Sequence, residues 1–187
     1  MSRLNPRDLL VLDTQAVARR PGAMVEVSRT VDAPPGLGTD VVCVPEGAPI
    51  ELQLRLESVV EGVLVSGSCR TQASGECVRC LDSLLFDLDL DIQELFAYPD
   101  TAAADAEEIT QVEDELVDFR PVLRDAVVLA LPLQPVCQDD CLGLCAMCGA
   151  RLGDDPEHQH DQVDPRWAAL GGLHRQDSNA SDAPGAS

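Results

Sequence analysis

Alternation of apolar and polar residues predicts β-strands in the middle of the chain. Apolar residues occupy every second position over residues 50–57, and residues 86–93 repeat the pattern. Strict alternation of this kind is typical of a strand with one buried face. Residues 59–69 contain the apolar run 63–65, which favours a central strand with both faces covered. Residues 24–31 alternate less regularly and predict a further strand.

Two segments instead resemble helices. Residues 118–131 carry apolar side chains at helical spacing, with Pro121 near the start and Pro132 after the end, which predicts a buried helix. Near the N-terminus, Asn5 and Pro6 precede an apolar stretch. Asn is a good N-cap and Pro suits the first helical position, so this arrangement predicts an N-terminal helix.

Successive strands with tight connections favour an antiparallel arrangement. The sequence therefore predicts an α+β fold: an antiparallel β-sheet or split barrel with an N-terminal helix, one buried helix and a small C-terminal Cys-rich zinc-binding module. We expect one domain over residues 1–175 and a disordered polar tail at 176–187. The predicted segments are an N-terminal helix at 1–20, a β region at 21–98, an acidic linker at 99–117, the buried helix at 118–131 and the Cys-rich module at 132–175.

The amino-acid composition limits the classes of protein to which the chain can belong. Of the 187 residues, 45% are hydrophobic and only 3% aromatic, so the core must consist mainly of Val, Leu and Ala. The longest apolar run, at 126–133, is far shorter than the ~20 residues that a membrane-spanning helix needs. Acidic residues Asp8 and Asp13 flank the apolar residues near the N-terminus, so no signal-peptide core forms. We expect a cytoplasmic protein that does not contact membranes.

The charge is strongly acidic. The chain has 13 basic and 33 acidic residues, for a net charge of −20. This balance argues against a protein that coats nucleic acid with its general surface, because phosphate binding needs a basic face. Residues 82–119 hold thirteen acidic residues and no basic one. That segment suits a basic protein partner, or equally a solvated surface with no partner.

Six of the eight cysteines follow metal-binding spacing. A Cys-x-x-Cys turn offers two sulfurs to one ion, and zinc takes four thiolate or imidazole ligands. Clustered cysteines in the cytosol more often bind metal or take part in redox chemistry than form disulfides. We therefore predict a structural Zn²⁺ site among the patterned cysteines. The candidate ligands are Cys77, Cys80, Cys137, Cys141, Cys145 and Cys148.

Spacing leaves three groupings open. The pair at 77 and 80 can join the pair at 145 and 148, or the pair at 137 and 141, and the last four cysteines can form a local site. His158 and His160 are possible further ligands. Cys43 and Cys69 are solitary, and we expect them to pack as small hydrophobic residues.

Catalytic patterns are weak. A redox Cys-x-x-Cys sits at a helix N-terminus, which lowers the thiol pKa. Here Cys80 precedes a predicted strand, and Glu76 and Asp82 have the wrong charge to stabilise a thiolate. Glu157, His158, His160 and Asp161 can be imagined as a hydrolase site, but a solvated loop before a short helix at 165–170 is the better interpretation. Without a phosphate loop or nucleophile elbow, we expect neither enzymatic activity nor a small-molecule substrate.

Several motifs together resemble a known family. Residues 129–137, 140–145 and 148–152, together with 75–80 and 164–170, resemble the YceD-like family in its high-GC Gram-positive form. The resemblance implies a non-enzymatic accessory factor in the accumulation or processing of large-subunit (23S) ribosomal RNA and in ribosome biogenesis. Its implied partners are that RNA or a basic large-subunit ribosomal protein. The alternatives are a zinc-ribbon-like adaptor for another complex, or a thiol redox or metal-handling protein.

Overall fold

The computed structural model describes residues 4–101, 110–155 and 157–160. The chain divides into two compact units, Met1–Cys141 and Leu142–Ser187. Regular secondary structure among the described residues lies in the first unit.

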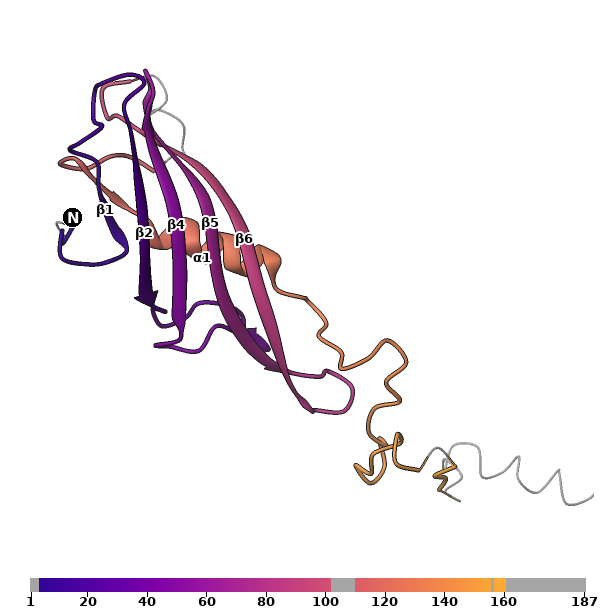
Figure 1. Cartoon of the computed structure of the whole chain (residues 1–187). Coiled ribbons are helices and arrows are strands. Elements are labelled where there is room, and N and C mark those ends of the chain that lie inside the picture. Colours follow the sequence, from indigo (N-terminus) through magenta and orange to yellow (C-terminus); the bar gives the residue numbers. More distant parts are fainter. Residues whose placement is uncertain (1–3, 102–109, 156, 161–187) are drawn as a thin grey trace, which may run out of the picture. The chain divides into compact units, whose positions relative to one another are not determined.

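An antiparallel sheet forms most of the first unit (Figure 1). Strand β5 pairs with β4 along one edge and with β6 along the other, and β2 pairs with the far edge of β4. The short strand β3 pairs with the end of β5. The predicted antiparallel sheet and the central position of β5 are thus confirmed. The five strands of this sheet within the described residues are β2 (Met24–Asp32), β3 (Val42–Cys43), β4 (Pro49–Ser58), β5 (Gly62–Glu76) and β6 (Ser83–Ala97).

The predicted buried helix is also present. Helix α1 spans Arg120–Ala130 and lies across the sheet in Figure 1. Its Leu123 and Val127 are fully buried in the main hydrophobic cluster. No helix in the described part of the chain is long and apolar enough to cross a membrane.

The core lies on one face of the sheet because the strand pattern alternates. Inward side chains of β4 and β5, such as Leu52, Leu56 and Val65, are at most 1% exposed. The intervening residues of β4 are polar and mostly exposed. One face of the sheet is therefore covered by apolar packing, whereas the other remains polar.

The prediction of an N-terminal helix over residues 1–20 is wrong. Among the described residues, this region contains turns and strand β1 (Val11–Asp13), which pairs with β7 (Leu116–Asp118). Side-chain oxygens of Asn5 and Asp8 accept backbone hydrogen bonds from Arg7 and Leu10. Such local bonds compete with helix formation. A short continuous apolar run is compatible with a strand as well as a helix.

The predicted acidic linker at 99–117 also contains ordered β structure. The backbone N–H of Val112 donates to the carbonyl of Ala97 at 2.9 Å, and Val112 and Val117 are buried. Both valines belong to the main hydrophobic cluster, so they anchor this segment despite its many acidic residues. Residues 102–109 of this linker lie outside the described residues, as do the predicted helix at 165–170 and the tail at 176–187.

Candidate metal centres

The turn between β5 and β6 presents two of the candidate cysteines. The Cys77 N–H donates to the Asp82 carbonyl at 2.8 Å, and the Leu81 N–H donates to the Cys77 carbonyl at 2.9 Å. Leu81 has a positive φ of 62°, which tightens the turn. Cys77 is fully buried and Cys80 is 8% exposed. The closed turn therefore holds both thiols in fixed positions.

The chain that follows α1 supplies the other two thiols. The Val78 N–H donates to the Pro135 carbonyl at 2.9 Å. The Arg79 guanidinium donates to the carbonyls of Asp139 and Cys141, at 2.9 and 3.1 Å. These bonds attach the segment that carries Cys137 and Cys141 to the hairpin turn.

Cys77, Cys80, Cys137 and Cys141 come together in one compact group, called the four-thiol cluster below. Its sulfur atoms all lie within 4.8 Å of one another. The Sγ atoms of Cys77 and Cys141 are 3.9 Å apart, and those of Cys80 and Cys137 are 3.6 Å apart. A tetrahedral ion with Zn–S bonds of about 2.3 Å needs sulfur separations of about 3.8 Å. The cluster therefore has the donor set and the dimensions of a zinc site.

The thiol pKa values within the four-thiol cluster move in opposite directions. Burial raises the pKa of Cys77, but N–H groups of Cys80, Arg79 and Cys137 lower it to about 6. The Asp82 N–H lowers the pKa of Cys80, yet burial and the Cys77 thiol raise it more strongly, well above its usual value. Neighbouring thiols that share one site resist joint ionisation. A bound cation would favour the thiolate form of all four.

The second unit brings the remaining patterned cysteines together with two histidines. Cys145, Cys148, His158 and His160 place one ligand atom each within 4.8 Å of the others. They are called the mixed cluster below. The pKa of Cys145 falls to about 6, chiefly because the N–H groups of Met147 and Cys148 face its sulfur. Of the three groupings that spacing allowed, the structure forms the one that joins Cys77 and Cys80 to the pair at 137 and 141.

The two solitary cysteines lie in different environments. Cys69 is fully buried in the main core, and burial raises its pKa to about 11, as expected for an inert packing residue. Cys43 is exposed on the short strand β3. The prediction that it packs in the core is therefore wrong. Of the imagined hydrolase group, Asp161 lies outside the described residues, and both histidines belong to the mixed cluster.

Sequence reasoning missed the groups that support the four-thiol cluster. Arg79 lies between two candidate ligands, and their spacing alone gives it no role. Val136 and Leu84 pack against the buried cysteines. An arginine inside a Cys-x-x-Cys turn is a signal for a polar contact near the turn, but no sequence pattern identifies backbone carbonyls as its acceptors.

The fold and the four-thiol cluster define a class: small, mostly antiparallel β proteins with one short helix and a cysteine cluster that can bind a metal ion. Comparison with known protein families identifies the particular family within this class. The family described as "Large ribosomal RNA subunit accumulation protein YceD" matches residues 65–174, more than half of the chain. The chain belongs to the YceD family.

Individual relatives support this assignment. An uncharacterized protein of Mycobacterium tuberculosis is 44% identical over 164 residues, covering 86% of this chain and 79% of that protein. An uncharacterized protein of Mycobacterium leprae is 40% identical over 164 residues, which cover 86% of this chain and 76% of that protein. The uncharacterized protein YlbN of Bacillus subtilis is 28% identical over 109 residues, covering 56% of this chain and 62% of its own. No solved structure matches the chain.

Proposed function

We propose that this protein is a non-enzymatic accessory factor that supports accumulation of 23S ribosomal RNA during assembly of the large ribosomal subunit in the cytoplasm. The observation that carries the proposal is the family match over residues 65–174. That region contains the four-thiol cluster, most of the long β5–β6 hairpin and α1.

A structural Zn²⁺ in the four-thiol cluster has a definite role in this proposal. It would link the tip of the β5–β6 hairpin to the segment that follows α1, through Cys77 and Cys80 on one side and Cys137 and Cys141 on the other. Zinc supplies no redox chemistry, and four protein ligands leave no open position for a substrate. The site is therefore suited to holding a surface in shape rather than to catalysis.

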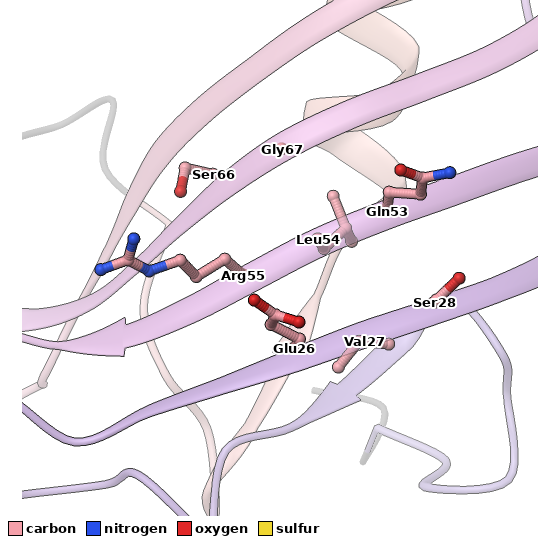
Figure 2. A pocket seen from close by; sticks show the side chains of 8 residues that line it. All are labelled: Glu26, Val27, Ser28, Gln53, Leu54, Arg55, Ser66 and Gly67. Atoms are coloured by element: carbon pink, nitrogen blue, oxygen red, sulfur yellow. The ribbon is translucent and has the colours of Figure 1, made fainter.

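The polar face of the sheet is the proposed docking surface for a basic large-subunit ribosomal protein. Both arginines on this face have acidic neighbours: Arg70 bonds Asp89 at 3.1 Å, and Arg55 bonds Glu57 at 2.6 Å. An open hollow lies on this face, and Figure 2 shows polar side chains of Glu26, Gln53 and Arg55 around it. The acidic residues that define the docking surface are Glu26, Glu51, Glu57, Asp87, Asp89 and Asp91.

Charge complementarity supports a basic protein as the occupant rather than RNA. Six carboxylates accompany two guanidinium groups on the docking surface, and the whole chain has a net charge of −20. Phosphate groups would be repelled by such a surface, whereas a Lys- or Arg-rich protein segment would be attracted to it. In this proposal the protein shields the basic surface of its partner until RNA replaces it.

Sedimentation tests the assembly role. Lysates of the native host are separated on sucrose gradients, and the protein is followed by immunoblotting. We expect it in fractions that contain immature large subunits and not in fractions of mature ribosomes. A protein that stays at the top of the gradient, even after mild crosslinking, would contradict the assembly role.

Salt-dependent binding tests the docking surface. We predict that Asp87→Asn/Asp91→Asn weakens binding to the partner among purified basic large-subunit proteins by roughly 2- to 30-fold, since each exposed ion pair contributes ~0.2–1 kcal/mol. Binding of the wild type should weaken as salt rises.

A matched control removes the same charge elsewhere. Asp40→Asn/Glu46→Gln neutralises two exposed acids in the loops that flank β3. This control should bind like the wild type. Equal weakening by both double variants would show a general charge effect, and the absence of binding at low salt would eliminate the docking surface.

A further inference from the structure

The described part of the second unit lacks an apolar core. No buried apolar side chain occurs among the described residues of this unit, and Leu142 and Met147 are 56% and 60% exposed. A segment this small rarely keeps a fixed fold unless a metal ion or a disulfide replaces the missing core. The described residues of this unit therefore need another source of stability.

Its backbone nevertheless forms a closed turn around two cysteines. The Cys145 N–H donates to the Ala150 carbonyl at 2.7 Å, and the Gly149 N–H donates to the Cys145 carbonyl at 2.8 Å. Gly149 has a φ of 74°, a conformation that glycine adopts without strain. The Met147 N–H also points at the Cys145 sulfur, at 3.4 Å. The turn therefore holds the two cysteines in place, with a backbone donor on one of the sulfurs.

Two histidines complete the set of ligand atoms. The Nε2 atom of His160 lies 3.2 Å from the Cys145 sulfur, and that of His158 lies 3.2 Å from the Cys148 sulfur. The two Nε2 atoms are 2.9 Å apart. The other ring nitrogen of His158 is 4.0 Å from a carboxylate oxygen of Asp155. This separation is too long for a hydrogen bond, so the candidate site rests on the four ligand atoms themselves.

We propose that Cys145, Cys148, His158 and His160 form a second Zn²⁺ site that is contained in the second unit. Ideal tetrahedral separations are about 3.6 Å between sulfur and nitrogen and about 3.3 Å between nitrogens. The observed distances are within a few tenths of an ångström of these values. A tetrahedral set of two sulfurs and two nitrogens suits zinc among the divalent metals. This site is independent of the proposed role in ribosomal RNA accumulation.

The two sites differ in access. Cys148 and His160 are exposed, whereas three cysteines of the four-thiol cluster are buried. A chelator reaches exposed ligands more easily. The mixed cluster therefore releases its ion first when the full-length protein is treated with a competing chelator, and the four-thiol cluster releases its ion later.

Metal content of the full chain tests this proposal. Protein purified without chelator should contain two zinc ions per chain. His158→Gln/His160→Gln should contain one, and Cys77→Ser/Cys80→Ser should also contain one. His174→Gln, which changes the remaining histidine of the chain, should keep both. Wild-type zinc content in His158→Gln/His160→Gln would overturn the second site.

If the wild type contains only one zinc ion per chain, the two variants show which of the two sites holds it. If that zinc is lost only in the Cys77→Ser/Cys80→Ser variant, the mixed site is overturned and the four-thiol site is retained. If it is lost only in the His158→Gln/His160→Gln variant, the mixed site is supported and the four-thiol site is contradicted.

A measurement on the wild-type protein tests the same site without relying on variants that could misfold. Nitrogen-15 NMR of the zinc-loaded wild type should show metal-bound Nε2 atoms in two histidines. After complete chelation, both signals should revert to those of free imidazoles. Histidine signals that are the same with and without zinc would overturn the proposal.

Discussion

At the scale of single residues, the environment of each cysteine decides its role. Cys69 and Cys77 are both fully buried, yet burial raises the pKa of Cys69 to about 11, whereas backbone N–H groups hold the pKa of Cys77 at about 6. The difference arises from the tight turn after β5, where amide hydrogens point at the Cys77 sulfur. Burial alone therefore does not distinguish a packing cysteine from a ligand.

A pair of single substitutions tests that distinction. We predict that Cys77→Ser lowers the zinc content by about one ion per chain, because a tetrahedral site with three thiolates binds zinc far less tightly. Cys43→Ser is the control, since Cys43 is exposed and belongs to neither cluster. Elemental analysis of both proteins gives the comparison. Equal zinc contents in Cys77→Ser and Cys43→Ser would remove Cys77 from the ligand set.

At the scale of elements, the sheet depends on close contact between β4 and β5. Gly67 has a φ of 150°, and a Cβ atom added there would lie 2.9 Å from the Cα of Leu54. We predict that Gly67→Ala lowers the free energy of unfolding by ~2–4 kcal/mol, through backbone strain and separation of the paired strands. Urea denaturation followed by far-ultraviolet circular dichroism measures this change.

Gly47 is the control, because its φ is also positive but no neighbouring atom would contact an added Cβ. Its φ is 79°, and an added Cβ would meet nothing within 4 Å. Gly47→Ala should therefore cost only ~1–2 kcal/mol, the usual penalty of a left-handed residue. If both substitutions have the same effect, strand crowding does not contribute at Gly67.

The elements that sequence predicted correctly are those in which one physical rule dominates. Strict alternation identified β4 and β6, and helical spacing between two prolines identified α1. The N-terminal prediction failed because residues 9–12 are apolar without a period, and their strand partner β7 is about a hundred residues away. Local sequence does not encode such a distant pairing. The same limit left the cysteine groupings open until the fold brought the hairpin turn and residues 137–141 together.

At the scale of the whole molecule, the main hydrophobic core and the four-thiol cluster are separate groups of buried residues. The hydrophobic cluster between the sheet and α1 includes Cys69 but none of the six candidate ligands. Three of those ligands form a small cluster of their own with Leu84 and Val136. The sheet is thus expected to fold without metal, whereas the segments around both cysteine clusters depend on it.

Chelation tests this separation. We predict that metal removal leaves the β-sheet circular dichroism signal intact while residues 132–160 become sensitive to limited proteolysis. Zinc added back to the stripped protein should restore the protection of residues 132–160. Complete degradation of the stripped protein, or unchanged resistance of the whole chain, would contradict it.

We infer that a metal-stabilised end of the β5–β6 hairpin serves the accumulation of 23S ribosomal RNA. The most direct measurement is the ratio of 23S to 16S ribosomal RNA in host cells depleted of this protein and supplied with either the wild type or Cys77→Ser/Cys141→Ser. We expect a lowered ratio on depletion, a restored ratio with the wild type, and no restoration with the variant when it is present at equal abundance. An unchanged ratio on depletion, or full rescue by the variant, would contradict it.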